Sequence, residues 1–392
     1  MRHIFGIKTY FTITDDRHRL HGLDHLRAAA IAMVVLFHYD YYYGVPEWLA
    51  YASRFGWSGV DLFFVLSGYL IADKLYRGIE ADGKIDFNGF YLNRFLRIIP
   101  AYLAVVVLYF TFPDLYEGRG LQPIWKFLTF TQNISIDMHK NTFSHAWSLC
   151  VEEHFYLFFP MLIYLTFSIR RPNMAVFLFV LVAVSGIIIR YVIWDMRVAP
   201  AYERMRLMIA LREIYYPTYT RLDGLLVGVA IASIFNYRPM LRDRLVKAGN
   251  LMLALSIMLL GVAYILFDGS LVSQRFTSLT TAVLGFNIIS IAYGLLVIAA
   301  MSPRCILSQY RIKPVAILAT LAYPIYLTHK MINHLVNTQL QALLDLDVHQ
   351  LFPISLAGVT ICGYALHLSV EKPFLILRDK LNRAKCNMSG NI

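Results

Sequence analysis

The sequence predicts an all-α fold, a polytopic membrane bundle of about ten transmembrane helices with both termini in the cytoplasm. Hydrophobic residues make up 58% of the 392 residues and charged residues only 16%, so the chain is far more apolar than a soluble globular domain. Apolar runs recur along the whole chain at about 20 residues each, the length that about 30 Å of hydrocarbon requires. Connections rich and poor in lysine and arginine alternate, which sets the orientation.

Ten apolar runs are long enough to be helical spans. A helix is expected in each, because a backbone in lipid has to satisfy its hydrogen bonds within its own segment. The expected spans are residues 25–43, 59–77, 98–113, 147–169, 174–194, 218–235, 250–267, 279–301, 314–336 and 351–375. Residues 123–136 are too few and too polar to cross a membrane, so we expect a re-entrant or interfacial piece there.

The basic residues orient these spans. The two tails and every second connection carry 22 lysines and arginines, against 9 in the other connections, and the positive-inside rule therefore puts both termini in the cytoplasm. The connection 195–217, with four arginines, departs from this pattern. The same distribution accounts for the net charge of +11, so no nucleic-acid partner is needed to explain it.

The chain divides into three parts. Residues 1–24 are expected to form a cytoplasmic segment, residues 25–375 an integral-membrane domain, and residues 376–392 a basic, solvated cytoplasmic tail. The four cysteines are scattered and include no C-x-x-C pair, so we expect neither a zinc site nor a disulfide framework. No internal repeat is evident, which weakens a transporter interpretation because many transporters are built from repeats.

The first span, "RAAAIAMVVLFHY", begins with Arg27 and carries His38 eleven residues later. Eleven steps of 100° bring both residues to one helix face, separated by about 16 Å along the axis. Arg27 is either an anchor at the cytoplasmic interface or a ligand for an anion. His38 lies deep in the span, as a satisfied core histidine or as a base, and an ionisable group in a bilayer is a functional hypothesis by default.

The second and third spans carry further polar residues. Asp61 opens the second span as an interface cap or a substrate-binding residue, and Ser67 and Gly68 lie within it, the glycine allowing close approach of another helix. Arg94 and Arg97 are three residues apart at the cytoplasmic end of the third span. Two guanidinium groups at that spacing suit a phosphate, although topology alone explains one of them.

The stretch "HAWSLCVEEHFYLFFP", residues 145–160, is the densest candidate site. Ser148, Glu152 and Tyr156 are four residues apart and share one helix face, while Glu153 points about 100° away. The two carboxylates cap the helix N-terminus or form part of a site. Because Tyr156 and apolar residues follow on the face of Glu152, that face is interpreted as a pocket wall.

Two later stretches complete the set of candidates. "TRLDGLLVGVAIA" places Arg221 and Asp223 at the head of the sixth span, where its Gly224 and Gly228 form a G-x-x-x-G packing motif. "LAYPIYLTHKMI" contributes His329 after two tyrosines. Each residue alone has a structural explanation, and together they suggest a polar substrate site inside the bundle.

These motifs, in this order, resemble those of the acyltransferase family 3 of integral-membrane proteins. The resemblance lies in R-x10-H, "GVDLFFVLSGYLI", R-x-x-R, "WSLCVEEHFYLFFP", "RLDGLLVGV", "LAYPIYLTH" and "EKPF", and extends from residue 23 to residue 374. The usual serine and glutamine of "WSLSVEEQFYL" are Cys150 and His154 here. The chain is similar to the stand-alone members, which lack an extracytoplasmic esterase-like domain.

The resemblance implies a multi-pass enzyme of the bacterial cytoplasmic membrane that transfers an acyl group, commonly acetyl, from acyl-CoA to a hydroxyl of a carbohydrate or glycolipid. It implies no bound cofactor, because the acyl-CoA is a substrate. Arg94 and Arg97, joined by Arg27, would hold the anionic end of CoA at the cytoplasmic mouth. The thioester would then reach His38, about 16 Å deeper.

Two mechanisms and two other classes of function stay open. His38 is expected to act as general base on the acceptor hydroxyl, with Glu152 or Glu153 orienting it, or to carry the acyl group as a covalent relay. Alternatively, Arg27, His38 and Glu152 form the proton relay of a transporter for a polar solute. A catalytically silent scaffold would require these polar residues to satisfy one another.

Overall fold

The computed structural model describes residues 21–168, 172–344 and 346–389, and all regular elements within them are helical. Most of the expected N-terminal segment 1–24, and the last three residues of the expected tail, lie outside the described residues. A long helix coincides with most of each of the ten expected spans, although α10 begins five residues late and α17 ends at Leu366, before the expected end at 375. These helices are α2 (His21–Tyr43), α4 (Gly59–Asp82), α5 (Phe87–Thr111), α7 (Trp147–Ser168), α8 (Pro172–Ile193), α10 (Asp223–Tyr237), α12 (Gly249–Phe267), α13 (Leu279–Met301), α15 (Lys313–Leu335) and α17 (Val348–Leu366).

Seven of the described helices are long and apolar enough to cross a membrane, or up to nine if each of two bent pairs is one span. One pair bends by 43° before α4, and the other by 112° between α10 and α11 (Pro239–Lys247). The protein is therefore a multi-pass membrane protein. The expected count of ten also includes α2, which is not among these helices because Asp24, Arg27 and Asp40 lower its mean hydropathy.

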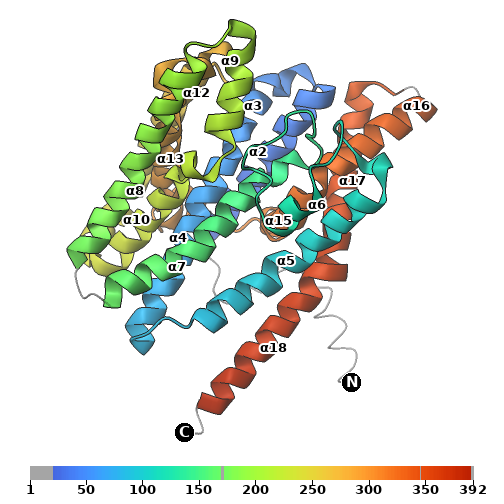
Figure 1. Ribbon diagram of the computed structural model, residues 1–392. Helices are drawn as coiled ribbons and strands as arrows, with labels where there is room; N and C mark the ends of the chain where they lie inside the picture. The colour runs from blue at the N-terminus through green and yellow to red at the C-terminus, as the bar shows by residue number, and fades with distance from the viewer. Residues whose placement is uncertain (1–20, 169–171, 345, 390–392) are drawn as a thin grey trace, which may run out of the picture.

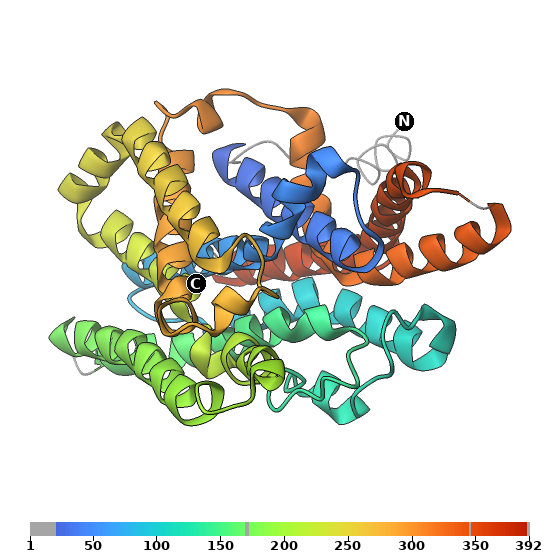
Figure 2. The ribbon, with the colours of Figure 1, turned by 90° about the horizontal axis from the view of Figure 1, so that it is seen from above.

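Short helices fill the connections. They are α3 (Ala50–Arg54), α6 (Ile124–Leu128), α9 (Glu203–Ala210), α14 (Ile306–Gln309) and α16 (Gln341–Leu344). Helix α6 lies within the segment expected to be re-entrant or interfacial, and at five residues it is far too short to span. Figure 2 shows α7 and α8 along one side of the molecule and α2 on the other.

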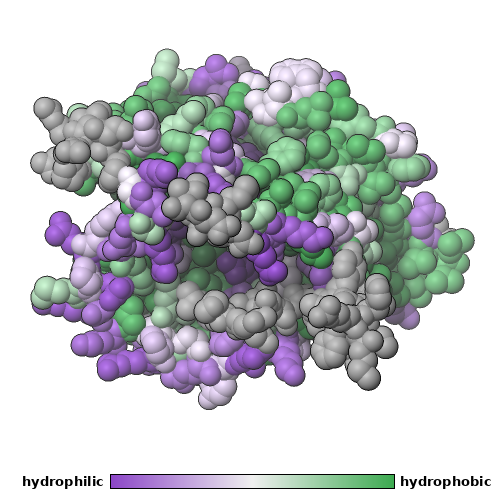
Figure 3. Space-filling view, turned by 90° about the horizontal axis from the view of Figure 1, so that it is seen from below, coloured by the Kyte–Doolittle hydropathy of each residue, from purple (hydrophilic) through white to green (hydrophobic). Residues whose placement is uncertain are grey.

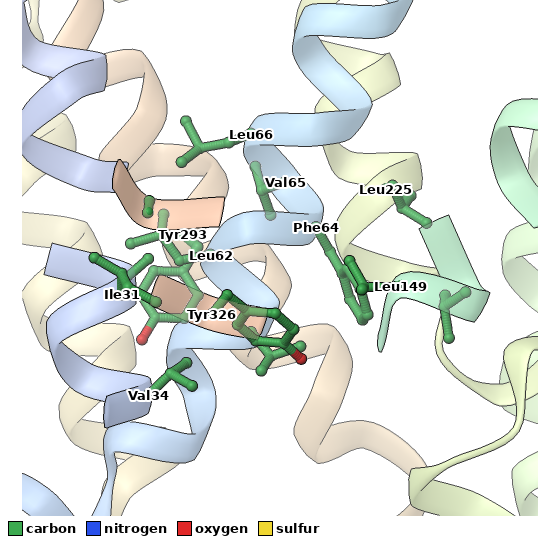
Figure 4. Packing of buried hydrophobic residues seen from close by; sticks show 14 of the residues in the cluster. Ile31, Val34, Leu62, Phe64, Val65, Leu66, Leu149, Leu225, Tyr293 and Tyr326 are labelled. Atoms are coloured by element: carbon green, nitrogen blue, oxygen red, sulfur yellow. The ribbon is translucent and has the colours of Figure 1, made fainter. Parts of the chain in front are cut away.

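Helix α4 forms the centre of the bundle and packs closely on α10. A Cβ at Gly68 would lie 2.1 Å from the carbonyl oxygen of Leu225, and one at Gly228 would lie 2.3 Å from that of Val65, so only glycine permits this approach. The packing confirms the role expected for Gly68 and for the G-x-x-x-G motif. Figure 4 shows the surrounding core, to which several helices contribute residues, among them Ile31 of α2 and Tyr293 of α13.

Helix α8 faces outward along most of its length. Only 6% of its most apolar stretch is buried inside the protein, and large side chains such as Val176, Phe177 and Ile188 are exposed. An apolar surface of this extent belongs against lipid. Its arginine, Arg190, is the exception and is fully buried toward α10 and α13.

The residues expected to form a basic tail are helical, and most of those between 376 and 385 are exposed. After α17, a π-helical turn (His367–Glu371) leads into α18 (Lys372–Ser389), which runs beyond the other helices in Figure 1. Asn382 donates to the side-chain carbonyl of Asn93 at 2.8 Å, and Lys385 contacts Asp86 at 2.5 Å. These contacts, together with packing along α5, fix α18 to the beginning of α5. The basic composition of the tail predicts its exposure to solvent and gives no sign of the contacts with α5.

Candidate active site

A cavity of about 510 Å³ lies between α2, α4, α5, α7, α15 and α18. This volume is within the range of about 300–1,000 Å³ that is typical of small-molecule sites. Five cations line the cavity, and they are Arg27, Lys74, Arg94, Arg97 and Arg378. Figure 3 shows the protein from the end at which α18 lies, with hydrophilic residues gathered across the middle of that face. The cavity thus combines positive charge with apolar walls.

Arg97 and Lys74 are the cavity cations without a side-chain partner among the described residues. Both side chains are exposed, and neither makes a hydrogen bond or ion pair with another residue in the described part of the chain. Arg94, Arg27 and Arg378 lie close enough to repel them electrostatically. Gathering like charges in a partly apolar cavity is unfavourable unless an anion joins them, so these residues suit an anionic ligand.

Arg94 is engaged with the acidic residues of α7. Its guanidinium lies 3.5 Å from Glu152 and 3.6 Å from Glu153, and stacks 3.0 Å from the centre of the Tyr156 ring. Ser67 and Tyr156 donate hydrogen bonds to the two oxygens of Glu152, at 3.2 and 2.6 Å. Glu152 is therefore satisfied within this cluster, and Arg94 is held by it. Of the expected arginine pair, only Arg97 stays open for a ligand.

Two hydroxyl groups form the inner end of the cavity. The oxygens of Ser148 and Tyr326 are 2.6 Å apart, and the Tyr326 hydroxyl donates to the backbone carbonyl of His145. Tyr326 therefore connects the cavity to a cluster of histidines. The ring of His145 lies 5.4 Å from the Tyr326 ring, 4.7 Å from that of His329 and 6.0 Å from that of His38.

His38 and His329 form a hydrogen-bonded pair whose proton positions follow from their neighbours. The Nδ1 atom of His329 lies 2.8 Å from the carbonyl of Tyr326, and because a carbonyl only accepts, this nitrogen carries the proton. The Nε2 atom of neutral His329 is then an acceptor, and His38 Nδ1 donates to it at 3.0 Å and to the carbonyl of Val34 at 3.0 Å. His38 Nε2 is left with a lone pair, as a base or nucleophile requires.

A buried ion pair lies beside this pair of histidines. Lys330, next to His329, is 3.1 Å from Glu117 and 5.1 Å from the centre of the Tyr42 ring. Glu117 also accepts from the backbone N–H of Phe143, a residue in the left-handed region with φ of 55°. The connection between α5 and α7 is thereby fixed on α15. It holds His145 against His329, with His145 itself only 2% exposed.

Three of the predicted substrate-binding residues form buried ion pairs between helices. Arg221 and Asp61 form an ion pair at 2.7 Å in which both side chains are almost fully buried, and the guanidinium also packs 3.9 Å from the Phe286 ring. Asp223 pairs with Arg190 at 2.6 Å and accepts from Asn287 at 2.7 Å. None of these residues lines the cavity. A polar residue in a span is explained equally well by a partner on another helix, and the structure provides such partners for all three.

The structure also separates the glutamates from His38. Glu152 and Glu153 contact Arg94, Ser67 and Tyr156, whereas the partner of His38 is His329. The described side chain that bonds to the His38 ring is thus an imidazole and not one of the predicted glutamates. Arg27 lines the cavity while its guanidinium is 2.8 Å from Asp24, and His38 lies beyond the cavity's inner end.

Sequence reasoning did not select three residues that complete this site. Lys330 was hidden because it follows His329 in an apolar span, and Glu117 because it lies in a connection. His145 stands at the head of the "HAWSLCVEEHFYLFFP" stretch, and its position beside "WSL" was the one available signal. Within the described residues, no group of three or more His, Cys, Asp or Glu side chains is arranged to hold a metal ion.

Comparison with known proteins identifies a family and several relatives. Residues 20–368 match the model of a family described as an acyltransferase domain. The O-acetyltransferase OatA of Staphylococcus aureus (strain NCTC 8325 / PS 47) is 29% identical over 338 residues, which cover 81% of this chain and 51% of that protein. The peptidoglycan O-acetyltransferase OatA of Listeria monocytogenes (strain EGD-e) is 29% identical over 343 residues, covering 82% and 50%. The chain thus spans about half the length of these relatives, and no solved structure matches it.

Proposed function

The chain belongs to this acyltransferase family, and from that membership we propose that it is a membrane-embedded O-acyltransferase. It moves an acyl group, with acetyl as the expected one, from acyl-CoA to a hydroxyl of a carbohydrate or glycolipid. The observation that carries the proposal is the cavity. Open cations line it, hydroxyl groups form its inner end, and a histidine with a free lone pair lies beyond.

The donor end of the proposal rests on charge. CoA carries a diphosphate and a 3′-phosphate at one end and the thioester at the end of a long neutral arm. Arg97 is free to bind phosphate, and Arg27, although paired with Asp24, adds positive charge to the same wall. Arg94 is a positioning residue, because its contacts with Glu152 and Glu153 shape the middle of the cavity. The arm then extends toward Ser148 and Tyr326.

The chemical step rests on His38. Its Nε2 takes the proton of the acceptor hydroxyl while the hydroxyl oxygen attacks the thioester carbonyl, and collapse of the tetrahedral intermediate expels the thiolate of CoA. The imidazolium gives its proton to that thiolate, so the products are the ester and free CoA. In the relay variant Nε2 itself attacks the thioester and expels the thiolate. The acyl group then passes to the hydroxyl oxygen, the hydroxyl proton goes to the thiolate, and the imidazole is restored. His329 acts as a positioning residue in both variants, because it fixes the tautomer of His38.

The acceptor is proposed from chemistry and from the relatives. The Listeria relative is named a peptidoglycan O-acetyltransferase, and we extend to this chain only the class of a carbohydrate hydroxyl. His38 is half-buried rather than sealed, and it lies about 16 Å along α2 from the cavity residue Arg27. Donor and acceptor are therefore expected to approach from opposite ends of the bundle, in a multi-pass protein of the cell membrane.

The first test is binding of acetyl-CoA to purified protein in nanodiscs. A ligand that prefers the folded state raises stability by RT ln(1 + [L]/Kd), about 2.7 kcal/mol at one hundred times Kd, so a rise in Tm reports binding without knowledge of the acceptor. We expect the rise in wild type and in His38→Ala, and a smaller one in Arg97→Ala. The exposed Arg77, on α4 but outside the cavity lining, supplies the control variant Arg77→Ala.

Turnover separates the proposal from its alternative. Release of CoA thiol from acetyl-CoA, measured with a crude cell-envelope glycan fraction as acceptor, should disappear in His38→Ala although the donor still binds. If no acyl-CoA shifts the Tm of the wild type, the donor assignment fails and a proton-coupled transporter becomes the better hypothesis. If His38→Ala folds and keeps full turnover, both the base and the relay mechanism fail.

A further inference from the structure

Helix α18 supplies one wall of the cavity although it lies outside residues 20–368, the part of the chain that matches the acyltransferase domain. Arg378, Asp379 and Asn382 of this helix line the cavity, and Lys74 of α4 lines it too. The side chains of Asn382 and Asn93 are hydrogen-bonded at 2.8 Å, so α18 is fixed to α5 at this level of the cavity. The cavity mouth is thus completed by a segment that the family match does not include.

The cations of the cavity lie at two levels. On α4, Ser67 contacts Glu152 in the middle of the cavity, and Lys74 follows seven residues later on the same face, about 10 Å nearer the cytoplasmic end of the helix. On the C-terminal segment, Glu371 and Arg378 are likewise seven residues apart and both line the cavity. Lys74 and Arg378 therefore form an outer level, and Arg97 belongs to an inner one.

The outer level carries more positive than negative charge. Lys74 makes no hydrogen bond or ion pair within the described residues. Arg378, Arg97 and Arg94 are close enough to repel it, and Asp86 is the one anion that attracts it among the groups acting on it most. Arg378 itself bonds to the adjacent Asp379 at 2.7 Å, which neutralises one charge of the pair at most. An excess positive charge is therefore held at the mouth, within electrostatic range of the inner charge of Arg97.

We propose that Lys74 and Arg378 bind the 3′-phosphate of the CoA donor, so that α18 makes the protein specific for 3′-phosphorylated donors. The proposal rests on the acyl-CoA donor proposed above and assigns the second of its two anionic groups. A ligand with a diphosphate and a separate phosphate matches two levels of cations, whereas a donor with a single anionic group would leave the outer level unused. The phosphate of an anionic lipid headgroup has the same chemistry and is the other possible source.

The test compares acetyl-CoA with its 3′-dephospho form. Binding is measured by Tm shift and by titration in nanodiscs of zwitterionic lipid, for wild type, Lys74→Met and Arg378→Met. The controls are Arg77→Met on α4 and Arg383→Met on α18, two exposed arginines outside the cavity lining. Methionine keeps an unbranched, flexible stem close to that of lysine and arginine and removes the charge, so most of the packing along the stem is conserved.

The expected result is selective. Wild type should prefer acetyl-CoA over the dephospho form, and each cavity variant should weaken acetyl-CoA binding by about tenfold or more, as expected for a lost charge-assisted phosphate contact. Binding of the dephospho form, and both controls, should be unchanged. In turnover with a glycan acceptor the same variants should raise KM for acetyl-CoA and leave kcat unaltered.

Three results would overturn the inference. Equal affinity of the wild type for the two donors would show that the 3′-phosphate makes no contact. An equal loss of both donors in the variants would show only general electrostatic attraction. Stabilisation by anionic lipid in the discs that disappears in Lys74→Met and Arg378→Met, with acetyl-CoA binding intact, would assign these cations to a headgroup. If the wild type binds neither donor, the donor proposal itself fails, which is a distinguishable outcome.

Discussion

Replacing His329 is the sharpest test of the chemistry. His329 Nε2 is 3.0 Å from His38 Nδ1 and is the acceptor that fixes the tautomer of His38. When His38 takes up a proton, this hydrogen bond becomes charge-assisted, and such bonds contribute about 1.5–3 kcal/mol. Since each 1.36 kcal/mol is about tenfold in rate, His329→Leu should lower kcat by about 10- to 150-fold.

The assay is release of CoA thiol from acetyl-CoA by protein in nanodiscs, with binding of acetyl-CoA measured in parallel by Tm shift. His329→Gln, whose side-chain oxygen can accept the same hydrogen bond, should lose less activity than His329→Leu. His334→Leu, a half-buried position on the same helix that takes no part in the pair, is the matched control. A folded His329→Leu protein that binds acetyl-CoA and turns over within twofold of wild type would refute the assignment of the tautomer.

Three further predictions concern the bundle. Arg221→Met leaves the buried carboxylate of Asp61 without its partner and should lower the free energy of unfolding by about 3–5 kcal/mol. The loss is measured as a fall in Tm, and the added change Asp61→Asn should partly restore the Tm. Gly228→Leu should abolish recovery of folded protein, because even a Cβ added there would lie 2.3 Å from a backbone oxygen of α4. The hydrogen bond from Lys385 lowers the pKa of Asp86, so their contact stabilises α18 above the ordinary carboxyl pKa of about 3.9 and is lost as the pH falls through the lowered value. Hydrogen exchange of α18 should show this dependence in wild type and lose it in Asp86→Asn.

The positions of the helices could be predicted because the thickness of the hydrocarbon sets the length of an apolar run. The eighth expected span, 279–301, has the bounds of α13 as observed. The ends of α4 and α5 were not predictable in this way. Helix α4 extends to Asp82 and helix α5 begins at Phe87, beyond the expected spans 59–77 and 98–113. The added turns are polar helices that hydropathy cannot distinguish from a loop.

The partners of the polar residues were less predictable than the helices. The spacing of Arg27 and His38 places both on one face of α2, yet the structure gives them different surroundings, the cavity for Arg27 and His329 for His38. His38 and His329 are 291 residues apart, and Asp61 and Arg221 are 160 apart. Spacing within one helix says nothing about contacts of that kind, which depend on how the helices pack.

The cations that stabilise this bundle differ from those suited to ligand binding in whether their polar groups already have partners. Arg190 and Arg221 direct every strong contact to carboxylates, amides and carbonyls of neighbouring helices, so a ligand could bind them only by breaking a buried ion pair. Among the residues that the structure describes, Arg97 and Lys74 have no such contacts to break. A phosphate at these residues replaces only water and relieves repulsion between cations, so the same residue types that stabilise the fold on α8 and α10 are suited to binding where α4 and α5 line the cavity.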